Sequence, residues 1–356
     1  MSTPFYETTL DLNNIVLDLA DRPSKQSNSQ HRQLTERLAA FFSHMIKDQK
    51  SVESVWKPAG EWQNYNEEKN FLYSALLEKR IEDADHILKN FWRNKLGLIV
   101  KEYATFEALS TGNKNVTTPF LKSILRNYII WKDIYNLPVE RLELTAEVGS
   151  PWGCTIDNTL ITPKATRFHH NAMQLKNLLT ACNGTTIAEI GAGYGALCHY
   201  LVREIEDVKY IDFDLPETIV LAAYYLLSNF PDKRIFLYGE GKFDASTITK
   251  FDILLLPNYT IAEFQNKSVD VFFNSFSLSE MSPEANKRYI AEIARITKGF
   301  FLHNNMDRKG VVNRGFERIP ASEYPISEEH FILLNKNYDL FHSHLGDYKE
   351  FLYKVN

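Results

Sequence analysis

The sequence has few of the features that mark secreted, membrane-spanning or metal-binding proteins. Its 356 residues include only three cysteines, Cys154, Cys182 and Cys198, in unrelated contexts. Neither a disulfide framework nor a zinc site is therefore predicted. No apolar run approaches the roughly 20 residues that span a bilayer, and residues 1–14 are polar and acidic where a signal peptide would be basic and then apolar. We expect a soluble cytoplasmic protein with buried, reduced cysteines.

The chain also lacks any block of basic residues. Forty lysines and arginines stand against 45 acids, which gives a formal charge of −5. A nucleic-acid partner is bound largely through phosphate contacts to basic side chains, so none is expected here. The length fits one large domain or two modest ones with a real core.

Hydrophobic periodicity divides the chain into two parts. In residues 31–46, 66–103 and 118–135, apolar side chains recur three and four apart, which predicts helices. From residue 187 onward, short apolar runs alternate with helical segments, which predicts strand-helix-strand units and a parallel sheet. The prediction is therefore a helical region over residues 1–145 and an α/β domain over residues 146–356.

Two local signals refine the second part. Ser282 can cap a helix whose first turn holds Pro283, directly after the predicted strand at residues 268–276. Near the C-terminus, DLFHSH (339–344) and KEFLYKV (349–355) are separated by LGDY. This pattern predicts an antiparallel hairpin at the edge of the sheet.

Three glycines alternate in IAEIGAGYGALCHYL, residues 187–201. Residues 187–190 predict a buried strand and residues 196–205 a helix, so Gly191, Gly193 and Gly195 occupy the turn between them. Missing Cβ atoms allow a sharp bend there and let a ligand approach the backbone N–H groups. The pattern Gly191-x-Gly193-x-x-Ala196 also satisfies the dinucleotide fingerprint, so an NAD-dependent oxidoreductase is one alternative.

Acidic residues beside this turn favour a cationic ligand over a pyrophosphate. Glu189 lies two residues before the first glycine, at the end of the predicted strand. The next strand carries Asp212 and Asp214, of which Asp214 lies nearer the strand end. An acid at that position can accept hydrogen bonds from ribose hydroxyls.

These residues resemble a known family. Glu189-x-Gly191-x-Gly193-x-Gly195 resembles the first motif of class I S-adenosylmethionine-dependent methyltransferases, and residues 213–216, Phe-Asp-Leu-Pro, resemble the ribose-binding stretch of their small-molecule O-methyltransferases. Residues 272–295, GSPWG at 149–153 and the His169-His170 pair are similar to a bacterial sugar O-methyltransferase family. The resemblance covers roughly residues 145–310. It implies a Rossmann-like α/β fold with a seven-stranded sheet whose last strand is antiparallel.

The resemblance also implies S-adenosyl-L-methionine as cofactor, and its chemistry suggests contacts. Glu189 would face the ammonium group, and Asp214 would bind both ribose hydroxyls. The adenine amino group needs an acceptor, for which Glu240 and Asn258 are both candidates. The remaining predicted cofactor-binding residues are Gly191, Gly193, Tyr194 and Gly195 near the methionine and ribose, Leu215 against the adenine, and Asn274 at the cleft.

The acceptor is predicted to be a sugar or sugar-like hydroxyl, which needs a general base. Phenolic O-methyltransferases have a histidine at the end of the fourth strand, where this sequence has Ser279 and Glu280. The candidates for the base are Glu280, His303, which is expected to face the cleft edge, and His169. No acidic cluster with ligand spacing is found, so a metal is not expected.

Several alternatives remain open. The chain could be an O- or N-methyltransferase of a non-sugar natural product or peptide, or a non-catalytic interaction protein with a methyltransferase fold. Residues 1–145 are expected to form an acceptor-site wall or a contact in a homodimer, by analogy with helices appended to this fold. Trp56 and Trp152 are candidates for stacking on a sugar or a phenol.

Overall fold

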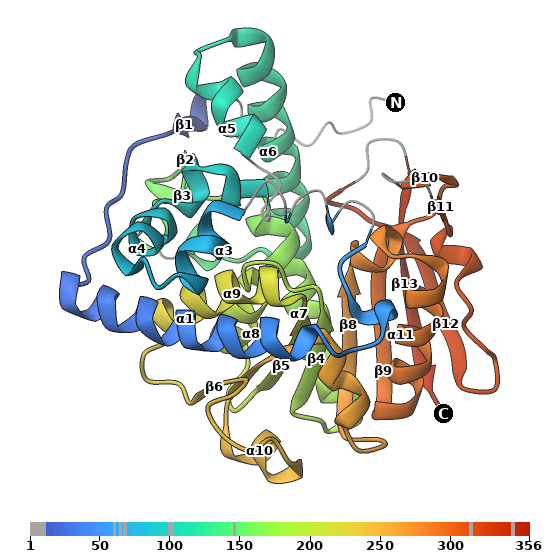
Figure 1. Cartoon of the computed structure of the whole chain (residues 1–356). Helices are drawn as coiled ribbons and strands as arrows, with labels where there is room; N and C mark the ends of the chain where they lie inside the picture. Colours follow the sequence, from blue (N-terminus) through green and yellow to red (C-terminus); the bar gives the residue numbers. More distant parts are fainter. Residues whose placement is uncertain are drawn as a thin grey trace, which may run out of the picture. The chain divides into compact units, whose positions relative to one another are not determined.

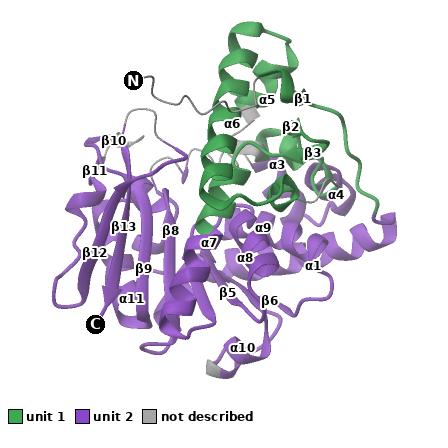
Figure 2. Cartoon of the chain, turned by 180° about the vertical axis from the view of Figure 1, so that it is seen from behind, with its two compact units in different colours: residues 1–25, 89–171 green, residues 26–88, 172–356 purple. Residues whose placement is uncertain are grey.

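The chain divides into two compact units (Figure 2). The computed structural model describes residues 12–59, 62–63, 66, 70–98, 103–144, 147–312, 316–342 and 346–356. Unit 1 comprises residues 1–25 and 89–171, and unit 2 comprises residues 26–88 and 172–356. The boundary predicted at residue 145 is therefore not the one observed. Residues 26–88 group with the large sheet because helix α1 (Asn28–Gln49) lies against helix α9 (Pro216–Asn229).

Unit 1 is not all helical, as the sequence had suggested for the N-terminal region. Strand β1 (Val16–Asp18) pairs with β2 (Gly153–Ile156), which pairs with β3 (Thr159–Ile161), and both pairings are antiparallel. Three residues are too few to show a clear alternation, so β1 leaves little signal in the sequence. The other elements are α5 (Tyr103–Ser110), α6 (Lys114–Tyr135), the first part of α7 (Ala165–Cys182), and the short 3-10 helices η1 (Leu12–Asn14), η3 (Phe91–Arg93), η4 (Lys95–Leu98) and η5 (Val139–Leu142).

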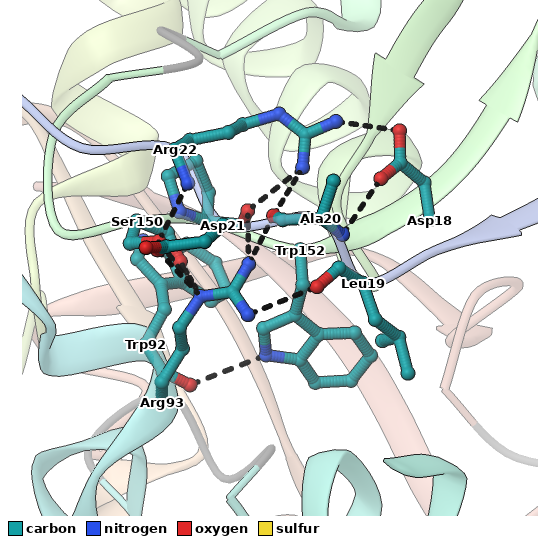
Figure 3. A network of polar contacts seen from close by, with 10 residues as sticks. Asp18, Leu19, Ala20, Asp21, Arg22, Trp92, Arg93, Ser150 and Trp152 are labelled. Carbon is teal, nitrogen blue, oxygen red and sulfur yellow. Dashed lines mark hydrogen bonds and ion pairs between the residues drawn. The ribbon is translucent and has the colours of Figure 1, made fainter. Parts of the chain in front are cut away.

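The GSPWG motif belongs to the interior of unit 1 (Figure 3). The Arg93 guanidinium donates hydrogen bonds to the backbone oxygens of Ser150 (2.9 Å) and Leu19 (3.0 Å). The Trp152 indole is fully buried and donates to the carbonyl oxygen of Trp92 at 3.2 Å. These contacts join residues 18–22 to the turn at residues 149–152. Because Trp152 is fully buried, the expectation that it stacks on an acceptor is not supported.

The helices of unit 2 that precede the sheet only partly follow the predicted periodicity. Helix α1 confirms the helix expected over residues 31–46, and Ser27 caps it in a capping box with Gln30. The stretch over residues 66–103 is broken into α3 (Asn70–Leu77), α4 (Ile81–Lys89) and short turns. The break lies at Lys79, whose φ of 56° is left-handed. Helix termination of this kind usually involves glycine, so a lysine at this position does not predict the break.

The large sheet of unit 2 has eight strands in the order β12-β13-β9-β8-β4-β5-β7-β6, one more than the resemblance implied. Its last strand, β13, is antiparallel to both neighbours, as expected. The strands β4 to β9 are mutually parallel. The eight strands of the sheet are β4 (Thr186–Ile190), β5 (Lys209–Asp214), β6 (Ile235–Leu237), β7 (Ile253–Pro257), β8 (Val269–Ser275), β9 (Thr297–Met306), β12 (Phe331–Tyr338) and β13 (Tyr348–Val355).

The C-terminal hairpin uses a different first strand from the predicted one. Strand β12 ends at Tyr338, before the segment 339–344 that was expected to form it. The side chain of Asp339 accepts hydrogen bonds from the backbone N–H groups of Phe341 (2.9 Å) and His342 (3.1 Å). This turn ends the strand, because an aspartate that bonds nearby backbone N–H groups favours a turn. Residues 343–344 lie outside the described residues.

Helices lie against the sheet (Figure 1), and apolar side chains of its strands are buried. On one face, Ile190, Phe213 and Phe272 form a buried core with Ile290 and Ile293 of helix α11. Ser282 caps α11 and Pro283 is its first residue, as predicted. The remaining elements are α8 (Ala196–Glu204), α10 (Ala245–Lys250), α11 (Pro283–Ile296), the antiparallel pair β10 (Gly310–Val312) and β11 (Phe316–Arg318), and the short 3-10 helices η2 (Ser54–Trp56), η6 (Asn258–Glu263), η7 (Ser277–Glu280) and η8 (Ala321–Glu323).

The strand order fixes where a ligand would bind. Strand β4 lies between β5 and β8, and the chain runs outward from it in both directions. In open α/β sheets, ligands bind at the carboxyl ends of the strands at such a reversal. The register sets Glu189 opposite Asp212 on β5, and it sets Asp214 opposite Pro257 on β7.

Within the part of the chain that the structure describes, no helix is long and apolar enough to cross a membrane.

Candidate ligand site at the carboxyl ends of strands β4 and β5

The glycine turn follows β4 directly and leads into α8, as predicted. Gly191, Gly193 and Gly195 all have positive φ angles, of 77°, 68° and 87°. A Cβ atom on Gly191 would lie 2.6 Å from the hydroxyl oxygen of Ser277. The protein's own packing and backbone conformation therefore exclude a side chain at Gly191, so its glycine does not by itself indicate a ligand.

The N–H groups of the three glycines are bonded within the protein. Gly191 donates to the carbonyl oxygen of Phe213 at 3.0 Å, and Gly195 donates to that of Ala192 at 3.2 Å. Gly193 donates to the carboxylate of Asp214 at 3.2 Å. A dinucleotide turn uses such N–H groups for the pyrophosphate. Here they are engaged elsewhere, which disfavours the NAD-dependent alternative.

Three carboxyl groups are buried beneath this turn. The Tyr210 hydroxyl donates a hydrogen bond to Glu189. Asp212 is fully buried, and neither of its oxygens accepts a well-formed hydrogen bond. Burial raises the pKa of Asp212 well above its ordinary value, and the nearby carboxyls of Asp214 and Glu189 raise it further, while the N–H of Ala192 lowers it slightly. Asp212 therefore keeps its proton to a higher pH than an exposed aspartate does.

Asp214 lies at the tip of β5 and joins the glycine turn to α9. Besides the Gly193 bond, its carboxylate accepts the N–H of Leu215 at 2.7 Å, and Leu215 is the N-cap of α9. Tyr73 of α3 lies close by and donates to the carbonyl oxygen of Glu217 at 2.8 Å. Burial, then Glu217 and Asp214, raise the pKa of Tyr73. The helix α3 thus reaches the tip of β5.

The structure separates the two candidates for binding adenine. Glu240 is exposed, and its carboxylate accepts two hydrogen bonds from the Arg37 guanidinium, at 2.5 and 2.8 Å. Asn258 is buried at the end of β7, where its amide nitrogen donates to the Trp56 carbonyl (2.9 Å) and the Tyr289 hydroxyl (2.7 Å). Its amide oxygen is buried without a hydrogen-bond partner. The amide oxygen of Asn258 is therefore an acceptor without a partner, whereas the Glu240 carboxylate is paired with Arg37.

Two other predicted cofactor-binding residues have contacts inside the protein. The amide of Asn274 donates to the carbonyl oxygen of Ile190 at 2.9 Å and accepts from Asn305 at 2.8 Å, so it ties the ends of β4, β8 and β9 together. The Tyr194 ring is buried edge-on against Tyr225 of α9, with 5.2 Å between ring centroids. Contact of either side chain with a cofactor stays a prediction.

The end of β8 has a strained backbone. Phe276 has φ 71° and ψ −39°, a conformation that L-residues rarely adopt and that concentrates at functional sites. Four residues later, Glu280 is buried in η7, and the Trp62 indole N–H donates to its carboxylate at 2.9 Å. Trp62 was not predicted as a functional residue. Trp56, by contrast, packs edge-on against Tyr289 at 5.0 Å and is buried, so it does not offer a face to an acceptor.

The structure corrects the expectation for His303. Its ring is fully buried between Phe351, Tyr353 and Tyr324 and does not face the cleft edge. Burial lowers its pKa to about 3. An inaccessible imidazole with so low a pKa is a poor general base. Alternate side chains of β9 point to the face of the sheet that α11 covers. His303 lies two residues after Phe301, so both rings belong to the aromatic core on that face.

His169 lies in unit 1 and has contacts that suit packing. The ring is fully buried, and its Nδ1 accepts a hydrogen bond from the Trp131 indole at 3.0 Å. It also packs edge-on against Trp131 and Tyr135. A catalytic role for His169 stays a prediction. No three His, Cys, Asp or Glu side chains in the described ranges are grouped so as to hold a metal ion, and metal independence likewise stays a prediction.

Comparisons with known proteins give distant structural similarities. The sequence matches no protein-family model and no curated protein. The chain is similar over 55% of its length to 56% of the mitomycin 7-O-methyltransferase MmcR, with 13% identity and a TM-score of 0.37. It is similar over 54% of its length to 84% of magnesium protoporphyrin IX methyltransferase (ChlM) from Synechocystis, solved with bound SAH, with 12% identity and a TM-score of 0.37.

A third solved structure of the same kind is an S-adenosylmethionine-dependent methyltransferase from Clostridium acetobutylicum. The similarity covers 53% of this chain and 92% of that one, with 11% identity and a TM-score of 0.37. All three proteins are methyltransferases. At these identities and TM-scores the similarity does not place the chain in a family, so its function has to be inferred from its own residues.

The buried histidines predict a pH dependence of stability. Burial lowers the pKa of His303 and of His199 to about 3, from an ordinary 6.5. Between these values the unfolded chain binds protons that the folded chain does not, so the free energy of unfolding should fall as the pH drops below 6.5. Each of the two histidines should lower the free energy of unfolding by about 2 kcal/mol at about pH 5 relative to pH 7. Urea unfolding of the wild type and His303→Phe at both values measures this loss, which should be about 2 kcal/mol smaller in the variant. The same loss in both proteins would show that His303 titrates normally.

Proposed function

We propose that the chain is an S-adenosylmethionine-dependent methyltransferase whose acceptor is a hydroxyl of a sugar or sugar-like small molecule. The cofactor supplies an electrophilic methyl group on a positively charged sulfonium. The charge of the buried site carries the proposal: Glu189, Asp212 and Asp214 converge at the ends of two neighbouring strands. A buried carboxylate is costly unless a cation or hydrogen bonds stabilise it. A ligand with an ammonium and a sulfonium fits this site, and a pyrophosphate does not.

The described residues fit the cofactor group by group. Glu189 and Asp212 would hold the ammonium group. Asp214 accepts hydrogen bonds from two backbone N–H groups, and its carboxylate would also accept hydrogen bonds from the ribose hydroxyls. Leu215, next in the chain, would pack on the adenine. The unpartnered oxygen of Asn258 would accept a hydrogen bond from the adenine amino group.

Glu280 is the residue that we propose as general base. It lies at the end of β8, next to β4 in the sheet, and it is buried, which keeps water away from the reacting hydroxyl. The Trp62 indole donates to the Glu280 carboxylate and orients it, and the carboxylate would take the acceptor's proton as the new bond forms. The sugar acceptor rests on the sequence resemblance. Metal independence, a homodimer and a soluble cytoplasmic location stay parts of the proposal.

Binding of S-adenosylhomocysteine tests the cofactor site. Isothermal titration calorimetry should show binding to the wild type and a loss of at least about 100-fold in affinity for Asp214→Ala, because the ribose loses a charged acceptor. Asn258→Ala should lose about tenfold. Glu240→Ala is the matched control, because Glu240 is an acid at a nearby strand end that is already paired. The affinity of this variant for S-adenosylhomocysteine should stay within about threefold of the wild type. If the wild type gave no heat, the methyltransferase proposal would fail, and a catalytically silent interaction protein would replace it.

Turnover of Glu280→Gln tests the general base. Transfer of labelled methyl groups from S-adenosylmethionine to a panel of neutral sugars should fall at least about 100-fold, because an amide cannot accept the hydroxyl proton. Affinity for S-adenosylhomocysteine should remain within about threefold of the wild type, since Glu280 lies on β8 and outside the proposed cofactor contacts. Full turnover by Glu280→Gln would exclude it as the base.

A further inference from the structure

A polar cavity lies beside the proposed cofactor site, within unit 2. Its volume is about 540 Å³, and the described residues that line it are Pro58, Gln63, Asn66, Asn70 and Glu217. Glu217 belongs to the first turn of α9, three residues after Asp214. The other four belong to the segment that leads into α3. The cavity thus adjoins the tip of β5.

Asn66 gives the clearest sign of a ligand in this cavity. Its amide nitrogen and amide oxygen are both buried, and neither has a hydrogen-bond partner. A buried polar atom without a partner destabilises the folded protein. Buried amides in folded proteins are normally satisfied. An amide held unpaired at a cavity wall is therefore suited to a ligand that both accepts and donates hydrogen bonds.

The remaining lining residues define the chemistry of that ligand. Gln63 and Asn70 add further amide groups, at helical spacing from Asn66 along one side of the segment. The only charged residue among the described lining residues is Glu217, an acid, whose carboxylate accepts a hydrogen bond from Gln49 at 3.3 Å. No lysine or arginine is among them. Among the described lining residues a phosphate or carboxylate would therefore meet no positive charge, whereas hydroxyl groups match the amides.

We infer that this cavity is a binding subsite for an uncharged, hydroxyl-rich group and that Asn66 determines its specificity. The same segment connects the subsite to the proposed chemistry, because Trp62, next to Gln63, contacts Glu280 at the end of β8. Tyr73 of the following helix contacts the backbone of Glu217. The segment therefore reaches both sides of β4, where the glycine turn lies.

The inference rests on the proposed methyltransferase function in one respect. That reaction brings two hydroxyl-rich groups to this edge of the sheet, the ribose of the cofactor and a sugar acceptor. Both share vicinal hydroxyls, the chemistry that Asn66 recognises. Because the described lining residues include no lysine or arginine, the inference favours a neutral sugar over a phosphorylated one as the group bound in this cavity.

Two binding measurements on Asn66→Ala and Asn66→Leu test the subsite and identify the source of the hydroxyls. Calorimetry with S-adenosylhomocysteine reports on the ribose. Saturation-transfer NMR with methyl glucoside and methyl rhamnoside, on the protein with S-adenosylhomocysteine present, reports on the acceptor, with glucose 1-phosphate as the charged comparison. Asn337→Ala, an exposed asparagine on β12, is the matched control. Since Asn66 has no hydrogen bond to lose, both variants should melt within a few degrees of the wild type.

We expect both Asn66 variants to bind either S-adenosylhomocysteine or the neutral glycosides more weakly than the wild type, by about tenfold or more. Asn337→Ala should bind both as the wild type does. Loss of S-adenosylhomocysteine affinity assigns the subsite to the ribose, and loss of glycoside binding assigns it to the acceptor. The inference is overturned if the Asn66 variants bind both S-adenosylhomocysteine and the glycosides as tightly as the wild type does. It is also overturned if S-adenosylhomocysteine binding is unchanged and no glycoside binds the wild type. It is also overturned if glucose 1-phosphate binds more tightly than the glycosides through Asn66. If S-adenosylhomocysteine does not bind the wild type, the proposed function fails, and the glycosides alone decide the subsite.

Discussion

The structure of the site depends on negative charge buried at the carboxyl ends of β4 and β5. Glu189 and Asp212 face each other across the ladder, and Asp214 follows at the strand tip. The Tyr210 hydroxyl donates a hydrogen bond to Glu189, and the Gly193 and Leu215 N–H groups donate to Asp214. That arrangement selects against anions and favours a cation, which is why S-adenosylmethionine fits better than a dinucleotide despite the glycine pattern.

Residues 26–88 extend the site beyond the sheet. The Trp56 carbonyl fixes the amide of Asn258 at β7, Tyr73 contacts α9 beside Asp214, and the Trp62 indole holds Glu280 at β8. These residues are far from the glycine turn in sequence, yet they supply polar contacts at three strand ends. The segment therefore takes part in the proposed ligand site rather than forming a separate helical domain.

The sequence predicted the parts of the fold that local patterns encode. The parallel strands, the glycine turn, the cap at Ser282 and the antiparallel last strand follow from hydrophobic periodicity, turn residues and the family resemblance. The features that the sequence did not predict depend on tertiary contacts. His303 follows the alternation of β9 into an aromatic core, and Asp339 ends β12 before the predicted hairpin strand. For Asn66 a signal existed, since Gln63, Asn66 and Asn70 recur at helical spacing, but only the cavity distinguishes such a polar stripe from a solvated helix face.

The central claim is that the buried acids bind the ammonium end of the cofactor. Calorimetric titration of the wild type with S-adenosylhomocysteine, and with the analogue that lacks only its amino group, tests this most directly. We predict that removing the amino group lowers the affinity at least about 100-fold, because the carboxyls lose the cation that offsets their burial. Equal or tighter binding of the deaminated analogue would contradict the account.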